Sequence, residues 1–212
     1  MKLDKPRLPV RYVDSLESLA ELNTALKGLT RVALDAERAS GFRYSQRAYL
    51  IQIATETEIF LVDPSALTDL DEHWSASLAK VLNPITWLLH AATQDLPCLA
   101  ELGIFPSAII DTELGSRLAG LERVGLGSIA LELLDLELAK EHSAADWSLR
   151  PLSEEMLDYA ALDVDVMFEV WEKLESILSE QGKLAWAFEE FEHLVSFKPK
   201  PISAEPWRNL PG

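Results

Sequence analysis

Five short apolar runs of strand length fall within the first 111 residues, whereas the rest of the chain has helical spacing almost throughout. These runs are RVALDAE, YLIQIAT, EIFLVDP, TWLLHA and AIID, at residues 31–37, 49–55, 58–64, 86–91 and 108–111. Only a few polar residues separate the second run from the third, which is typical of a β-hairpin. Because strands come first and helices come last, the order predicts a mixed central β-sheet flanked by helices, a three-layer α/β fold with a helical C-terminal part.

The spacing of apolar residues predicts seven helices. They are expected at residues 13–29, 74–82, 93–102, 112–120, 126–135, 153–180 and 183–196. The first should begin at an N-cap provided by Asp14 or Ser15 and end near Gly28, since short polar residues favour helix starts and glycine favours helix ends. Residues 1–12, which include two prolines, are expected to form an extended lead-in.

The length of 212 residues and the apolar content of 48% fit one domain with an ample core. We expect this domain to cover residues 1–197. Residues 198–212 belong to the segment FKPKPISAEPWRNLPG, which holds four prolines and shows no periodicity. Such a segment is expected to form a linker or tail.

Composition excludes several classes of protein. The net charge of −16 argues against a protein that coats nucleic acid non-specifically, because phosphate binding requires Lys and Arg. Cys98 is the only cysteine, so no internal disulfide can form, and this fits a reducing compartment. The N-terminus lacks the apolar region of a signal peptide, and no apolar run is long enough to span a membrane. The sequence therefore predicts a cytoplasmic protein without membrane contact.

Acidic residues at the ends of apolar runs are the strongest functional signal. Asp35 and Glu37 end the first run, and residues two apart in a strand point to the same face. Two like charges this close repel unless a cation lies between them, and Mg²⁺ and Mn²⁺ prefer such oxygen ligands. The alternative is a strand end with ordinary solvent-exposed acids, since D-x-E often occurs by chance.

Two further stretches carry acids with the same ambiguity. Asp95 falls in the first turn of an expected helix, where the helix dipole alone favours an acid. His90, at the end of its strand, is expected to be a hydrogen-bonded structural residue. Tyr159 and Asp163 are four apart and share a face of a largely buried helix, where an acid needs a partner such as a metal ion. A Tyr–Asp hydrogen bond that only locks the packing is the alternative.

The ordered set D-x-E, then Asp, then Y-x-x-x-D is much more specific than its parts. With this set, the chain resembles the DEDD 3′–5′ exonucleases of the tyrosine-containing DEDDy subgroup and is most similar to the ribonuclease D branch. The resemblance runs from about Leu8 to Leu174. It includes LIQIA, FLVDP, LLHAATQDL, IIDTELGSRL and ADWSLRPLSEEMLDYAALDV, of which the last is the most discriminating.

The resemblance implies a ribonuclease H-like fold and hydrolysis with two divalent metal ions, Mg²⁺ or Mn²⁺. The implied metal ligands are Asp35, Glu37, Asp95 and Asp163. Tyr159 would hydrogen-bond and orient the attacking water, which completes the expected set of catalytic residues. Two cations roughly 3.5–4 Å apart can activate a bound water and stabilise the leaving oxygen, so the implied chemistry is physically consistent.

The activity that the resemblance implies is 3′–5′ exoribonuclease activity, with release of nucleoside 5′-monophosphates. The expected partner is RNA with a single-stranded 3′ end, such as precursor tRNA or another structured RNA, bound by a monomer. Two alternatives stay open: a DNA 3′–5′ exonuclease, and an inactive RNA-binding module on the same fold. Members of this branch often carry C-terminal helical domains, for which too few residues follow Val195. The chain is therefore expected to be either a catalytic fragment, whose residues 198–212 would lead into such domains, or a minimal member.

Other polar residues receive weaker interpretations. Many relatives carry an apolar residue directly after the motif glutamate, where this chain has a basic residue. The candidates for substrate contacts are Arg38, Arg43, Tyr44, Arg47 and Lys140. A solvated loop with ordinary arginines is the alternative for the first four. Asp111 is expected to cap the helix that follows it, and the segment with Trp147 and Arg150 is expected to fix the approach to the helix of Tyr159. The sequence does not indicate whether Gln52 points inward or outward.

Overall fold

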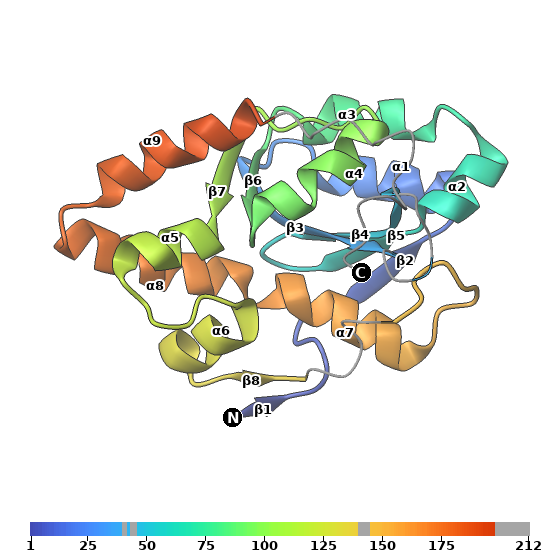
Figure 1. Ribbon diagram of the computed structural model, residues 1–212. Helices are drawn as coiled ribbons and strands as arrows, with labels where there is room; N and C mark the ends of the chain where they lie inside the picture. Colours follow the sequence, from blue (N-terminus) through green and yellow to red (C-terminus); the bar gives the residue numbers. More distant parts are fainter. Residues whose placement is uncertain (40–41, 43–45, 140–144, 198–212) are drawn as a thin grey trace, which may run out of the picture.

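The computed structural model describes residues 1–39, 42, 46–139 and 145–197. A six-stranded mixed sheet forms its centre, with the strand order β2-β5-β4-β3-β6-β7 (Figure 1). Strand β4 runs antiparallel to both of its neighbours, and the other pairs are parallel. Helices cover both faces of this sheet, so the prediction of a three-layer α/β fold is confirmed.

The five predicted strands all form. They are β3 (Arg31–Arg38), β4 (Ala48–Ala54), β5 (Ile59–Val62), β6 (Thr86–Leu89) and β7 (Ala108–Asp111). Every residue of β4 and β5 is buried, because these strands lie inside the sheet with helices on both sides. Continuous apolar runs such as YLIQIA are what two-sided burial requires.

Part of the expected lead-in is also a strand. Within it, β2 (Val10–Val13) pairs in parallel with β5 and forms one edge of the main sheet. Nearer the N-terminus, β1 (Lys2–Leu3) pairs with β8 (Glu137–Leu138) in a separate two-stranded sheet. Arg7, between β1 and β2, donates from its backbone N–H and its side chain to the buried carboxylate of Asp165. The N-terminal segment is thereby fastened to the helical layer.

The helices divide between two buried clusters, one on each face of the sheet. The first cluster contains α1 (Leu16–Ala25), α2 (Pro64–Leu70), α3 (Trp74–Leu82) and α4 (Leu96–Glu101). The second contains α5 (Thr112–Ala119), α6 (Leu126–Leu134), α7 (Glu154–Asp165), α8 (Met167–Glu180) and α9 (Leu184–Val195). In Figure 1, α7 lies beneath the sheet, opposite α1 to α4.

Several predicted boundaries are wrong, among them the following two. The single helix expected at residues 153–180 is two helices, α7 and α8, which meet at Val166. The strand expected at residues 58–64 ends at Val62, because the Asp63 carboxylate accepts hydrogen bonds from the backbone of Ser65 and Ala66 and starts α2. The predicted N-cap at Ser15 is confirmed, and its side chain accepts from the backbone N–H of Ser18.

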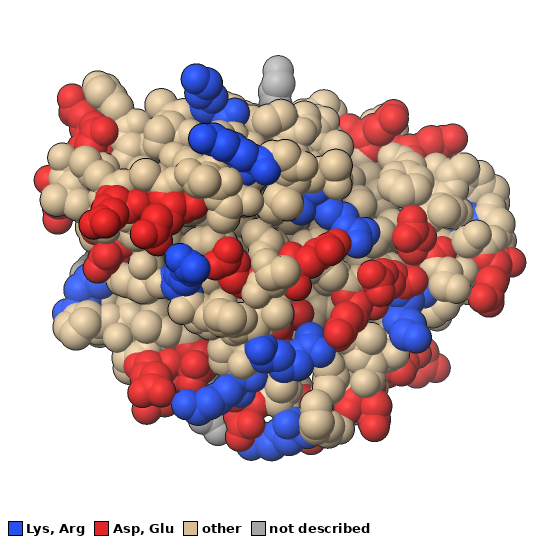
Figure 2. All heavy atoms as spheres, turned by 180° about the vertical axis from the view of Figure 1, so that it is seen from behind, with Lys and Arg blue, Asp and Glu red and all other residues tan. Residues whose placement is uncertain are grey.

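Acidic side chains are scattered over the face drawn in Figure 2, with basic side chains between them. The excess of negative charge is therefore not gathered at one place on this face. Across the described residues, no helix has both the length and the apolar character that crossing a membrane would require.

Candidate metal centre

Strand β3 carries Asp35 and Glu37 past the point where its pairing with β6 ends. Among the described residues, the ladder with β6 covers only Arg31 to Ala33, whereas the ladder with β4 continues to Arg38. One side of the second half of β3 therefore borders a cavity of about 310 Å³ instead of another strand. Both carboxylates line this cavity, as their spacing of two residues requires.

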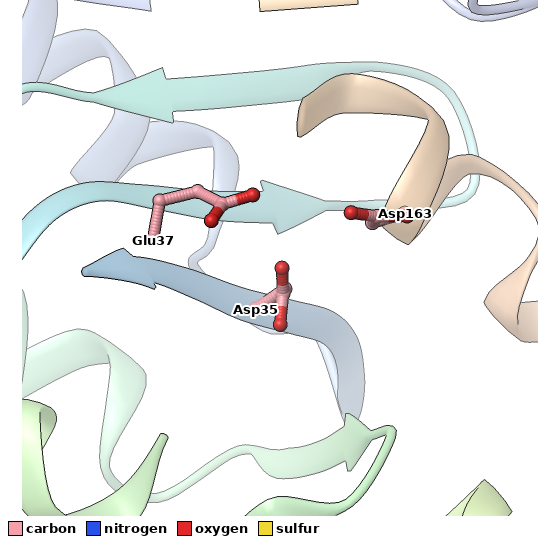
Figure 3. A group of neighbouring side chains, drawn as sticks. All are labelled: Asp35, Glu37 and Asp163. Carbon is pink, nitrogen blue, oxygen red and sulfur yellow. The ribbon is translucent and has the colours of Figure 1, made fainter. Parts of the chain in front are cut away.

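Helix α7 brings the third carboxylate. The chain places Asp163 in the last turns of α7, which packs over β3, β4 and β5. One carboxylate oxygen from each of Asp35, Glu37 and Asp163 lies within 4.8 Å of the other two. Figure 3 shows the three side chains converging from β3 and α7 on one space. Three hard oxygen donors at this spacing fit a small divalent cation.

Asp95 lines the same cavity. It stands at the N-cap position of α4, but its side chain makes no capping hydrogen bond, so it does not serve as a capping residue there. The turn before it is held by Asp111, whose carboxylate accepts from the backbone N–H groups of Ala91 and Ala92. Asp111 also caps α5, as predicted. It therefore has a structural role, and Asp95 is left facing the cavity.

The four carboxylates are held in an environment that opposes their ionisation. Burial raises the pKa of Asp35 to about 6. Burial, and then the charges of neighbouring acids, raise the pKa values of Glu37, Asp95 and Asp163 well above their usual values. The nearby positive charge of Arg38 acts in the opposite direction and lowers the pKa values of Asp35, Glu37 and Asp95. A bound cation would offset the free-energy cost of burying these negative charges and would reduce the repulsion between them. The donor set therefore fits Mg²⁺ or Mn²⁺.

Tyr159 lines the cavity one turn before Asp163 on α7. Burial, the charge of Asp163 and a hydrogen bond with that residue raise the pKa of Tyr159 far above its usual value. The phenol therefore stays protonated and keeps its capacity to donate a hydrogen bond. Trp147, which is buried, packs beside it with ring centroids 6.3 Å apart. The expected packing role of Trp147 fits this contact.

The basic candidates have different locations. Arg38 lines the cavity. Arg47 lies over the ring of Tyr49 at 4.8 Å and donates to Ser65, and it is not among the cavity-lining residues. The other three candidates, Arg43, Tyr44 and Lys140, lie outside the described residues.

Some cavity residues were not predicted. His90 lines the cavity and its Nδ1 lies 2.9 Å from the hydroxyl of Thr112, which agrees with a hydrogen-bonded structural residue. Burial lowers the pKa of His90. Gln94, Leu126 and Met167 also line the cavity. Gln94 could have been found as the neighbour of Asp95, but Leu126 and Met167 give no signal, because apolar residues at helical spacing are expected to be core.

A mixed sheet with a carboxylate-lined cavity beside its central strand defines a candidate divalent-metal centre on an α/β exonuclease fold. The chain belongs to the 3′–5′ exonuclease family, whose match covers residues 10–179. That range includes all four cavity carboxylates and Tyr159.

Relatives and solved structures agree with this membership. The chain is 32% identical over 170 residues to ribonuclease D of Xanthomonas oryzae pv. oryzae, which covers 78% of this chain and 46% of that protein. A solved protein from Bifidobacterium adolescentis is 39% identical with a TM-score of 0.90, over 98% of this chain and 51% of that one. The structure of Escherichia coli RNase D is 27% identical with a TM-score of 0.79, over 95% of this chain and 54% of that one. The chain thus spans about half the length of these proteins.

Proposed function

We propose that this chain is a 3′–5′ exoribonuclease that removes nucleotides from single-stranded RNA 3′ ends by two-metal hydrolysis. The observation that carries the proposal is the convergence of three carboxylates within 4.8 Å, with Asp95 on the same cavity. Support for RNA comes from the relative named ribonuclease D and from E. coli RNase D, which is described as an exoribonuclease involved in structured RNA processing. The substrate class proposed here is therefore tRNA or another structured RNA.

In this proposal, Asp35, Glu37, Asp95 and Asp163 hold two divalent cations. The cations would supply activation of a water molecule and neutralisation of charge on the leaving oxygen. Tyr159 donates a hydrogen bond from its hydroxyl to the attacking water and orients the water oxygen toward phosphorus. A bond forms between that oxygen and phosphorus, and the bond from phosphorus to the 3′ oxygen of the preceding nucleotide breaks. The water gives up a proton to solvent, the 3′ oxygen takes up a proton from solvent to become a hydroxyl, and a nucleoside 5′-monophosphate leaves.

The substrate would be positioned by the other cavity residues. The guanidinium of Arg38 is suited to a phosphate oxygen, because it carries fixed N–H donors and lies beside the acids. Leu126 and Met167 offer apolar surface to the terminal base. A 3′ end inside a duplex cannot bring its terminal phosphodiester into a cavity of about 310 Å³, which favours a single-stranded end. We propose a monomer, since one chain supplies the whole carboxylate set.

We also propose that residues 1–197 form the complete catalytic domain and that residues 198–212 are a linker or tail. The last described helix, α9, packs into the core through Ala187 and Phe191, before the proline-containing segment begins. A chain ending at residue 197 should therefore have the same melting temperature as the 212-residue chain. A clear loss of stability would contradict this boundary.

The proposed function is tested with a 5′-labelled single-stranded RNA incubated with Mn²⁺, beside the same reaction in EDTA. We expect a metal-dependent ladder that shortens by one nucleotide at a time from the 3′ end. Asp163→Asn, checked for folding by circular dichroism, serves as the inactive control. A DNA oligonucleotide of the same sequence tests the preference for RNA. Intact RNA with folded wild-type protein would count against the proposal and favour an inactive binding module, and faster digestion of DNA would change the substrate.

A further inference from the structure

Gln52 is a polar residue in the most deeply buried part of the sheet. It lies on β4 between Ile51 and Ile53, and its exposed fraction is 0%. Neither its side-chain nitrogen nor its side-chain oxygen has a hydrogen-bond partner among the described residues. Buried amides are almost always hydrogen-bonded, because leaving them unpaired costs free energy that an apolar residue would avoid. The position therefore needs an explanation beyond packing.

The register of the sheet places this amide beside the metal centre. Gln52 pairs directly with Asp35 across the antiparallel β3–β4 ladder, and Leu50 pairs with Glu37. Residues directly opposite each other share a face of the sheet, with Cβ atoms about 4.5–5.5 Å apart. Gln52 and Asp35 therefore point into the same layer, toward α7, which carries Asp163. A glutamine side chain is long enough to span the separation to the neighbouring carboxylate.

Apart from Asp35, the described residue that pairs with Gln52 across the sheet is apolar. On its other side it pairs with Leu61 of β5, and the helix above presents the buried Ala160, Ala161 and Val164. Asp35 accepts a hydrogen bond from the backbone of Ala36, which leaves further acceptor capacity on its two oxygens. The side-chain nitrogen of Gln52 is a donor, and a carboxylate oxygen is the acceptor that matches it.

We infer that Gln52 is a positioning residue that donates a hydrogen bond from its side-chain nitrogen to the Asp35 carboxylate when the site holds cations. This inference rests on the proposed function, because it assigns Asp35 as a ligand. Gln52 does not touch substrate or metal. It fixes the orientation of Asp35 so that the remaining lone pairs face the cations. Outer residues that orient a ligand typically change metal affinity by 10–100-fold when they are removed.

The inference is tested by Gln52→Met and Gln52→Leu, which keep an apolar side chain in the core but remove the donor. Leu50→Met is the matched control, because Leu50 lies on the same strand and face beside Glu37. The measurements are Mn²⁺ titration by isothermal calorimetry and thermal melting in EDTA. We expect Mn²⁺ affinity to fall 10–100-fold in both Gln52 variants and to stay within about twofold in the control. The melting temperature in EDTA should be unchanged or higher in the Gln52 variants.

Other outcomes separate this inference from the proposed function. If the Gln52 variants bind Mn²⁺ as the wild type does, Gln52 has no positioning role, whether or not their stability changes. An equal loss of affinity in Leu50→Met would likewise overturn the inference, since general packing under the site would then explain it. A second readout is the Mn²⁺ concentration for half-maximal RNA hydrolysis, which should rise 10–100-fold while the rate at saturating Mn²⁺ changes little. If the wild-type protein binds no Mn²⁺, the proposed two-metal function itself fails.

Discussion

At the scale of single residues, the carboxylates at the cavity oppose folding in the absence of metal. The protein buries Asp35, Glu37, Asp95 and Asp163 close together, and their pKa values are raised as a result. A carboxyl whose pKa is higher in the folded chain binds its proton more tightly there. The contribution of these carboxyls to the free energy of unfolding of the metal-free protein therefore decreases as the pH rises from about 4, the usual Asp value, through about 6, the folded value for Asp35.

Asp35→Asn should accordingly raise the melting temperature of the metal-free protein at pH 7. We expect an increase of roughly 2–8 °C, which for a domain of this size corresponds to about 1–2 kcal/mol. The increase should shrink toward pH 4, where the wild-type carboxyl becomes protonated. Differential scanning calorimetry in EDTA at several pH values measures this. Asp69→Asn, at an exposed position on α2, is the control and should change the melting temperature little. A lower melting temperature for Asp35→Asn would contradict the electrostatic account.

Tyr159→Phe should separate chemistry from metal binding. The phenol keeps its proton because its pKa is raised, and it lies on the cavity beside Asp163. Removing a hydrogen bond that positions the attacking water should lower kcat on the order of 100-fold. Single-turnover hydrolysis of a short RNA gives the rate, and calorimetry gives the Mn²⁺ affinity, which should stay close to that of the wild type. An unchanged rate would remove Tyr159 from the mechanism.

Among the elements, α7 carries both Tyr159 and Asp163, so its position decides the geometry of the site. The segment before α7 is anchored by Arg150, whose side chain donates to both oxygens of Asp63 and to the backbone carbonyl of Tyr49. The Asp63 carboxylate also accepts from the hydroxyl of Tyr12 at 2.7 Å. Burial alone would raise the pKa of Asp63, but the hydrogen bonds from Arg150 and Tyr12 hold it below its usual value. The ion pair between Arg150 and Asp63 thus joins the segment before α7 to the end of β5. Through Tyr12 and Tyr49 it also joins this segment to β2 and β4.

Arg150→Met should destabilise the protein strongly, because it leaves the buried Asp63 carboxylate without its cation. Breaking a buried ion pair typically costs about 3–5 kcal/mol. Arg117→Met, which breaks the exposed pair with Glu113, should cost less than about 1 kcal/mol. Urea unfolding at pH 7 compares the two variants.

The effect of Arg150→Met should also depend on pH. Since the pKa of Asp63 is lower in the folded state, the contribution of its carboxylate to stability is present above pH 4 and is lost as the pH falls further. The difference between Arg150→Met and the wild type should therefore shrink in acid, and a constant difference would contradict the ion-pair account.

The sequence predicted the central strands and brought together the acids that line the cavity, and the reasons are local. Period-two spacing in LDAE and period-four spacing in YAALD fix which side chains share a face. Strand β2 was missed because Val10 and Arg11 are exposed at the edge of the sheet, so VRYV lacks a buried pattern. The break between α7 and α8 was missed because apolar spacing continues through Val166. Just before this break, the carboxylate of Asp165 accepts hydrogen bonds from Arg7. Arg7 lies more than 150 residues away in sequence, so local spacing does not reveal this contact.

Gln52 could not be assigned from the sequence for a different reason. Its neighbour Asp35 is known only once the register between β3 and β4 is fixed, and a shift by one residue would turn Gln52 to the other face. Asp95 posed a similar problem, because an acid at a helix start is ordinary. Only the absence of a capping hydrogen bond and the turn held by Asp111 separate it from a simple N-cap.

At the scale of the whole molecule, the proposed cations would connect both layers that enclose the sheet. Asp95 comes from the layer of α4 and Asp163 from the layer of α7, with β3 between them.

Binding of Mn²⁺ to the folded state should raise the melting temperature by mass action. At a free Mn²⁺ concentration 100 times the Kd, we expect about 2.7 kcal/mol, or roughly 5–11 °C for this size. Thermal melting with Mn²⁺ and with EDTA measures the shift. The shift should vanish in Asp163→Asn, and a shift of equal size in that variant would place the bound metal elsewhere.

The separation of Asp35 and Asp163 along the chain also has a consequence for synthesis. More than half of the given sequence lies between these two residues, and α7 follows every described strand in the chain. A nascent chain that has already built β3, β4 and β5 holds Asp35 and Glu37 but lacks Asp95 and Asp163. The ribosome must therefore release α7 before a cation can be bound at full strength. The proposed cation site is in this sense timed by translation, because it can form only after Asp163 has left the ribosome.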